Sequence, residues 1–157
     1  MTKKVFNVIG KMVAAAFDMP FFDGDDFHPK ANLEKMASGS PLNDEDREGW
    51  LLDLNTLAIS HKATGAVIAC SALKAKYRSI LQQKIERKST FIFLQGSFDQ
   101  VYERLQQRKG HFMPKDLLQS QFDTLEEPSD ALTIIYDPND PYISCTSRNR
   151  GATLSHS

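Results

Sequence analysis

Three aspartates and a histidine lie within a few residues of one another in the segment 21–29. Asp23, Asp25 and Asp26 follow two phenylalanines and come just before His28-Pro29. An apolar strand that ends in carboxylates, directly before a helix, is where an open α/β sheet places ligand-binding groups. Carboxylates in that position can hold a metal ion or take a proton from a substrate hydroxyl. The alternative is an acidic turn closed by an Asx cap.

The elements that must position these groups alternate along the chain between short apolar runs and helical patterns. Strands are predicted at 5–9, 20–23, 66–70, 90–94 and 132–136. Helices are predicted at 11–17, 29–38, 43–61, 74–84, 98–109 and from 114 to about 125. Strands separated by helices imply right-handed βαβ crossovers. The predicted fold is therefore a three-layer α/β domain with a central parallel sheet flanked by helices.

The helix predicted at 43–61 has the clearest local signals. Asn43 is a candidate N-cap and Asp46 stands at the capping-box position. An apolar stripe at helical spacing predicts the face that joins the core. It consists of Trp50, Leu51, Leu54, Leu57 and Ala58.

Composition narrows the class of protein. The 157 residues suit one domain, and a net charge of −1 gives no reason to expect a nucleic-acid or membrane partner. No apolar run approaches the roughly 20 residues that cross a bilayer. The two cysteines, Cys70 and Cys145, form no CxxC pair, and Cys70 lies in an apolar run. A buried reduced thiol and a cytoplasmic location are expected.

Several longer motifs recur in an order and spacing that resemble one enzyme family over about three quarters of the chain. The matching segments are Asp23-Gly24-Asp25-x-x-His28-Pro29, 32–39, 41–47, Trp50-Leu51, Cys70-Ser71-Ala72-Leu73-Lys74-x-x-Tyr77-Arg78, 110–113 and 121–126. Together they resemble the gluconokinases, small phosphate-loop (P-loop) kinases related to shikimate kinase. The resemblance implies a P-loop-kinase-like fold and transfer of the γ-phosphate of ATP to the 6-hydroxyl of D-gluconate, with Mg²⁺. It is also compatible with a homodimer.

The resemblance also suggests a division of the chain. Residues 1–136 would form the kinase-like domain, with substrate-binding helices at about 29–61 and a lid at about 104–115. The tail, 137–157, has no periodicity and is predicted to be loop or disordered.

By the same resemblance, Asp25 would contact and deprotonate the substrate hydroxyl, while Asp23 would help to hold Mg²⁺ through water. His28 would hydrogen-bond a polyol hydroxyl, or else be satisfied locally in the first turn of its helix. Arg47 offers a planar fork for the gluconate carboxylate. Its alternative is a surface ion pair with Asp44 or the neighbours of Asp46.

A second set of candidates lies further along the chain. Ser71, Lys74 and Arg78 follow a buried strand, and Ser71 with the helix N-terminus would bind an anionic group. Lys74 and Arg78 share a helix face and would reach the substrate, or would form a solvated basic face. Arg104 and Arg108 precede the lid glycine, and an arginine there would close onto the ATP phosphates, with Arg108 the first choice. The alternative for these arginines is a charged helix end that complements the dipole. The resemblance places His111 with the substrate-binding residues.

One motif of the family is missing. P-loop kinases carry G-x-x-x-x-G-K-S/T between the first strand and first helix, where backbone N–H groups and the lysine cradle phosphates. Here Val8 is followed directly by Ile9-Gly10-Lys11, and Lys11 matches the helix after the loop, not the loop lysine. Impaired use of ATP is therefore expected of this chain. The alternatives are a non-catalytic variant that binds sugar acid or an intact kinase subunit, and a kinase of another polyol acid or shikimate.

Overall fold

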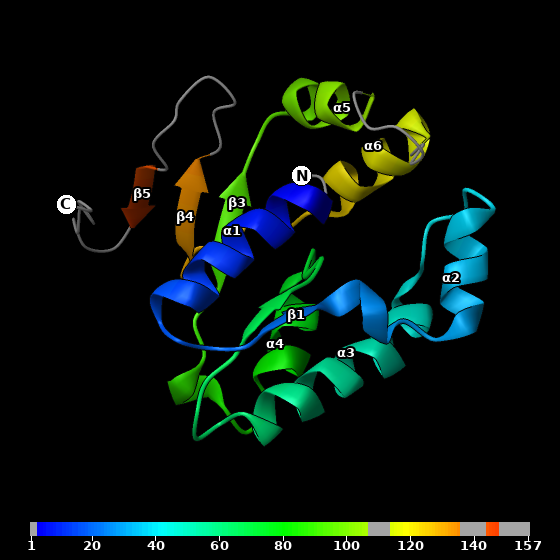
Figure 1. The fold of residues 1–157 in the computed structure, drawn as a ribbon. Coiled ribbons are helices and arrows are strands. Elements are labelled where there is room, and N and C mark those ends of the chain that lie inside the picture. The colour runs from blue at the N-terminus through cyan, green and yellow to red at the C-terminus, as the bar shows by residue number, and fades with distance from the viewer. Residues whose placement is uncertain (1–2, 107–113, 136–143, 148–157) are drawn as a thin grey trace.

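The computed structural model describes residues 3–106, 114–135 and 144–147. Its described strands form two separate sheets (Figure 1). The strands are β1 (Phe21–Asp23), β2 (Val67–Ala69), β3 (Ile92–Gln95), β4 (Leu132–Ile135) and β5 (Ser144–Ser147). β1 pairs in parallel with β2, and β3 pairs in parallel with β4, while β5 is antiparallel to β4.

Helices cover both sheets, as the predicted α/β class requires. They are α1 (Lys3–Ala16), η1 (Gly24–Phe27), α2 (Lys30–Ala37), α3 (Asp44–Ser60), α4 (Ala75–Gln82), η2 (Glu86–Lys88), α5 (Phe98–Gln106) and α6 (Lys115–Thr124), η1 and η2 being 3₁₀ turns. The strands predicted from 20 onward and the helices predicted from 29 onward are confirmed over the described residues, with bounds shifted by a few residues. Residues 107–109 and 136 of these predictions lie outside the described ranges. Within the described ranges, no helix is long and apolar enough to cross a membrane.

The strand predicted at 5–9 is wrong. Residues 3–16 form one continuous helix, α1, which also contains the helix predicted at 11–17. Nothing between the two segments stops a helix: the only glycine is Gly10, and no proline is present. Phe6, Ile9 and Val13 also recur at helical spacing, so the same residues that suit a strand can form one apolar helix face.

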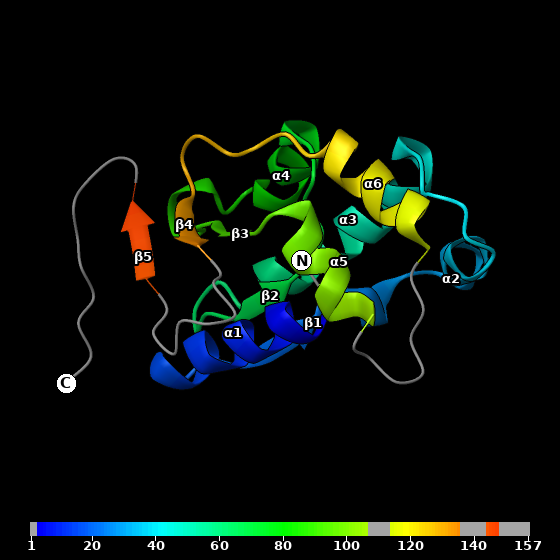
Figure 2. The same ribbon diagram turned by 90° about the horizontal axis from the view of Figure 1, so that it is seen from above.

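α1 connects the two sheets. Its residues Phe6, Ile9 and Val13 pack against Leu94 of β3 and Ile134 of β4. α1 also contacts β1 and β2. Figures 1 and 2 show α1 running across both sheets. The predicted central sheet is therefore divided, because the segment expected to supply a strand lies over the sheets as a helix.

The core beneath the first sheet is built on α3. Both halves of its capping box are present, since Asn43 Oδ1 accepts from Asp46 N and Asp46 Oδ2 accepts from Asn43 N, each at 2.8 Å. Of the predicted stripe, Trp50, Leu51 and Leu54 are fully buried, while Leu57 and Ala58 are half-buried. The buried three pack with Tyr77 and Leu81 of α4.

The tail contributes to the second sheet. β5 lies within the segment that was expected to be loop or disordered, and Thr133 of β4 pairs with Thr146. β5 covers the edge of β4 that faces away from β3. The other tail residues lie outside the described ranges.

Two helical glycines provide a test of the α1 packing. A Cβ at Gly10 would collide with the Phe21 ring, whereas a Cβ at Gly49 of α3 would meet nothing within 4 Å. We expect Gly49→Ala to raise the free energy of unfolding by about 0.5–1 kcal/mol, because alanine favours a helix. Gly10→Ala should lower it, because overpacking typically costs about 1–3 kcal/mol and outweighs that gain. Urea denaturation measures both, and equal stabilisation would contradict the packing of α1 on β1.

Candidate functional site

The end of β1 is held tightly so that the following carboxylates project from a fixed turn. Asp23 Oδ1 accepts a hydrogen bond from Asp25 N at 3.0 Å, which starts the 3₁₀ turn η1. Trp50 Nε1 donates to the carbonyl oxygen of Gly24 at 2.7 Å. A Cβ at Gly24 would lie 2.7 Å from the carbonyl oxygen of Ala69. Only glycine therefore lets the turn sit this close to β2.

His28 is buried next to Asp25. Its ring stacks on Trp50 with centroids 4.1 Å apart, and its Nε2 lies 3.9 Å from Asp25 Oδ1. Its Nδ1 lies 3.4 Å from Asn32 Nδ2, which also donates to the carbonyl oxygen of Asp46 at 2.7 Å. These contacts fix the imidazole, so its Nε2 edge stays directed toward the Asp25 carboxylate.

Arg47 is a buried cation. Only 7% of it is exposed, and its Nε has no hydrogen-bond partner among the described residues. Its guanidinium lies over the Tyr77 ring at 5.6 Å from the centroid. Burial lowers the pKa of Arg47, and the charges of Tyr77, Asp44 and Asp25 oppose that shift. The exposed surface pair considered for Arg47 is therefore wrong, and an N–H group is left for another acceptor.

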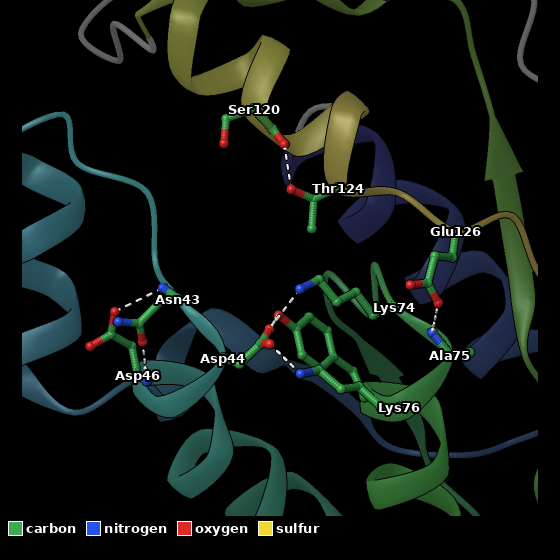
Figure 3. Close-up of polar contacts among 10 residues, drawn as sticks. Asn43, Asp44, Asp46, Lys74, Ala75, Lys76, Ser120, Thr124 and Glu126 are labelled. Atoms are coloured by element: carbon green, nitrogen blue, oxygen red, sulfur yellow. Dashed lines mark hydrogen bonds and ion pairs between the residues drawn. The ribbon is translucent and has the colours of Figure 1, made fainter.

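Asp44 gathers three donors at the start of α3 (Figure 3). It accepts from Lys74 Nζ at 2.8 Å, from Lys76 Nζ and from the Tyr77 hydroxyl. These hydrogen bonds hold the pKa of Asp44 well below its usual range. Burial, followed by the hydrogen bond to Asp44, raises the pKa of Tyr77 to about 12. The cluster therefore contains one carboxylate, two ammonium groups and a neutral phenol at neutral pH.

Arg78 supports the loop that follows β2. Its Nη1 donates to the carbonyl oxygens of Ala72 at 2.8 Å and Leu73 at 3.3 Å. Glu126 braces the same region, since its Oε2 accepts from Ala75 N at 2.7 Å and its N–H donates to the carbonyl of Leu73 at 2.8 Å. With Lys74 bound to Asp44, the solvated basic face considered for Lys74 and Arg78 is absent.

The predicted site residues fall into two places. His28 stacks on Trp50 beside Asp25, whose charge acts on Arg47, and Arg47 and Lys74 both lie over the Tyr77 ring. Ser71 and Arg78 instead line a cavity of about 1150 Å³ between the two sheets, whose described lining includes none of those four. Cys70 lines the same cavity as a free, half-buried thiol, and desolvation raises its pKa to about 12.

The described part of the chain contains no phosphate-binding turn before β1. Where a phosphate-binding turn would be needed, α1 is continuous, so its internal N–H groups are already bonded to the helix. Asp23 Oδ2 accepts from Asn7 Nδ2 of α1 at 2.9 Å. In the described ranges, no group of three His, Cys, Asp or Glu residues is placed to hold a metal ion. Lys11 is exposed, with Nζ above the Phe21 ring.

Comparison with known proteins identifies the family of the chain. The family model described as shikimate kinase matches residues 7–153. The chain belongs to the shikimate kinase family. The match includes the segment of β1, η1, α2 and α3. The match also includes most of the tail.

The relatives of this family member are gluconokinases, which confirms the resemblance seen in the sequence. The thermoresistant gluconokinase of Escherichia coli K12 is 47% identical over 124 residues, covering 78% of this chain and 70% of the relative. The thermosensitive gluconokinase of the same strain is 43% identical over 153 residues, covering 95% and 81%. A crystal structure of a gluconokinase from Sinorhizobium meliloti 1021 superposes with a TM-score of 0.78 at 38% identity, covering 89% of this chain and 79% of that one. The P-loop-kinase-like class is thereby confirmed.

The segment expected to be the lid of this family member is only partly described. Arg104 lies half-buried in the last turn of α5, where a cation complements the helix dipole. Arg108 and His111 lie outside the described residues. Pro114 caps α6, and Lys115 Nζ lies 5.5 Å from the centroid of the Tyr102 ring.

Four residues that shape the site, Asp44, Lys76, Tyr77 and Asn7, had not been predicted as site residues. Asp44 was considered only as a partner of Arg47, although its place in the first turn of α3 put it near that arginine. Tyr77 and Lys76 reach Asp44 only because α4 packs on α3. Asn7 was assigned to a strand, so its hydrogen bond to Asp23 had no signal in the sequence.

The Asp44 cluster predicts a shift in tyrosine titration. We expect Asp44→Asn to lower the pKa of Tyr77 from about 12, because the charged acceptor that stabilises the neutral phenol is lost. Burial should still hold it above the ordinary value of about 10. Ultraviolet absorbance of tyrosinate against pH measures the shift. Asp53→Asn, an exposed change in the same helix, is the control and should leave the titration unchanged.

Proposed function

We propose that the site formed by Asp25, His28, Arg47 and Lys74 binds D-gluconate, and that phosphoryl transfer from ATP is impaired in this chain. The first part is supported by the gluconokinase relatives and by the chemistry of the four side chains. The second is supported by the missing G-x-x-x-x-G-K-S/T motif and the continuous helix α1. The family is one of kinases, so its reaction is ATP-dependent phosphoryl transfer.

The buried guanidinium of Arg47 is the observation that carries the proposal. A desolvated cation with an unpartnered N–H is costly unless a ligand supplies an acceptor. A sugar acid offers a carboxylate, which arginine binds with charge-assisted and often bidentate hydrogen bonds. The carboxylate of gluconate would therefore bind at Arg47, next to the aromatic ring of Tyr77. Lys74 would add a second positive charge if it exchanged Asp44 for the substrate.

Asp25 is the candidate base. It lies in the turn η1, close enough to Arg47 for its charge to raise the arginine pKa. In this arrangement Asp25 would accept the proton of the substrate hydroxyl as that oxygen becomes the nucleophile. His28, held on Trp50, would orient the polyol through its Nε2 edge. Ser71 and Arg78 would act on the substrate less directly, by shaping the loop after β2.

The phosphate side of the reaction lacks its usual support. A P-loop supplies backbone N–H groups, a lysine and a hydroxyl that ligates Mg²⁺. Losing a single such donor typically costs about 3–4 kcal/mol of transition-state stabilisation. Asp23 would hold Mg²⁺ through water, yet one of its oxygens accepts from Asn7. The alternative function that we propose is that of a non-catalytic variant. Such a variant would bind a sugar acid without turnover, or would bind an intact kinase subunit.

Location and assembly belong to the same proposal. A cytoplasmic enzyme fits the free thiol of Cys70 and the substrate class. A homodimer fits the resemblance.

Substitution of Arg47 tests the carboxylate site. We expect Arg47→Gln to weaken gluconate binding about 10- to 150-fold, because hydrogen bonds to charged groups contribute about 1.5–3 kcal/mol. Isothermal titration with gluconate measures the change. Arg87→Gln, an exposed change in η2, is the matched control and should bind like the unmodified chain. Equal affinities for the two variants would contradict a substrate role for Arg47.

Restoring the loop tests the impairment. The unmodified chain should show no saturable binding of ATP with Mg²⁺ below millimolar nucleotide and little gluconate-dependent ADP release. A variant with a G-x-x-x-x-G-K-S/T segment inserted between Val8 and Ile9 should gain both. Tight ATP binding by the unmodified chain, or equal rates for the two, would overturn the account of the missing loop. Gluconate affinity, measured separately, would be unaffected by that outcome.

A further inference from the structure

The cavity between the two sheets is bordered by strand edges. Every residue of 66–73, which includes β2, and every residue of 90–97, which includes β3, lines it. Side chains alternate between the faces of a strand, so a cavity against one face would be lined by every second residue. Consecutive lining residues indicate that the cavity follows the edges of β2 and β3.

The backbone of these edges is directed into the cavity. Val67 N donates to the carbonyl oxygen of Pro20, so Val67 and Ala69 face β1 and Ile68 faces the other way. Likewise Leu132 N donates to the carbonyl oxygen of Phe91, so Phe93 faces β4 while Leu94 faces away from it. Neither Ile68 nor Leu94 has a strand neighbour on that side among the described residues. Unpaired edges of this kind favour the addition of another strand.

We propose that residues 5–9 of a second copy of this chain insert as a strand between β2 and β3, in a reciprocal exchange that forms a dimer. The lining of the cavity is largely apolar, including Ile68, Phe93 and Leu94. A strand placed there is buried on both faces and should be a continuous apolar run rather than an alternating one. Residues 5–9, Val-Phe-Asn-Val-Ile, meet that requirement apart from one asparagine.

The same chain is poorly placed to fill its own gap. A strand at 5–9 would leave the eleven residues 10–20 before β1 begins at Phe21. A parallel crossover needs about a dozen residues or more, and this connection would also have to pass over β2 to reach β1. In a second copy the connection runs between molecules and this restriction is removed. A two-fold symmetric exchange then uses the same surface on both partners.

The first half of α1 has weak local support as a helix, which favours its release from α1 into an extended strand. Three of residues 5–9 are β-branched, and such residues lose side-chain freedom in a helix. The first turn contains no acidic residue to complement the helix dipole. Asn7 Oδ1 is buried without a hydrogen-bond partner among the described residues. Strand exchange would remove these unfavourable features of the helix and add backbone pairing at the edges of β2 and β3.

Sedimentation equilibrium of the full chain over a range of concentrations tests the dimer. Val8 and Met12 are both exposed on α1, at 49% and 56%, and only Val8 lies in the exchanged segment. Val8→Ala favours the helix about three-fold per chain and should weaken a reciprocal dimer about ten-fold. Val8→Thr keeps a β-branched residue and should dimerise like the unmodified chain, as should Met12→Ala.

Amide hydrogen exchange locates the contact. The N–H groups of Ile68 and Leu94 should exchange fast in the dilute monomer and become protected in the dimer. Those of Val67 and Phe93, which face β1 and β4, should be protected in both states. A chain that stays monomeric, a dimer without added protection at Ile68 and Leu94, or equal effects of Val8→Ala and Met12→Ala would each overturn the proposal. Full protection of Ile68 and Leu94 in the monomer would also do so.

Discussion

The contact of α1 with both sheets is the interaction on which the described fold depends. β2 and β3 share no neighbouring strand, so their sheets are held together by side-chain packing and not by a backbone ladder. Ile9 packs on Leu94 and Ile134, while Gly10 lies directly against Phe21. A helix can bridge the sheets in this way, but it cannot satisfy the facing strand edges. This explains why a large cavity remains beneath an otherwise well-packed helix.

The site beside Trp50 is governed by the balance between burial and charge. Arg47 is buried and its Nε has no hydrogen-bond partner among the described residues, whereas Asp44 accepts from three donors. Both lie next to Tyr77, whose hydroxyl donates to Asp44 and whose ring lies under the Arg47 guanidinium. The carboxylate therefore has several hydrogen-bond donors, while the guanidinium lacks an acceptor for its Nε. Such an arrangement is suited to an anionic ligand, since a carboxylate can satisfy Arg47 and compete for Lys74 without leaving another buried charge unpaired.

The two halves of the expected reaction therefore differ in how well the chain supports them. The sugar-acid half rests on β1, η1 and α3, whose capping, glycine approach and indole hydrogen bond are all present. The phosphate half depended on a turn between a strand and a helix, and the chain has neither that turn nor that strand. The same absence removes the phosphate cradle and divides the sheet, so one local feature accounts for both the proposed loss of catalysis and the open strand edges.

The sequence by itself determined the elements whose signals are local. The Asn43–Asp46 capping box, the buried stripe of α3 and the turn after β1 follow from neighbouring residues, and the motifs identified the kinase family. It could not decide residues 5–9, because Val-Phe-Asn-Val-Ile suits a strand and, with Val13, also one face of a helix. Only tertiary packing against Leu94 and Ile134 decided for the helix. The pairing of Asp44 with Lys74 and Tyr77, and the burial of Arg47, were likewise settled by α4 packing on α3, since contacts between residues about thirty positions apart depend on how the helices pack rather than on local signals.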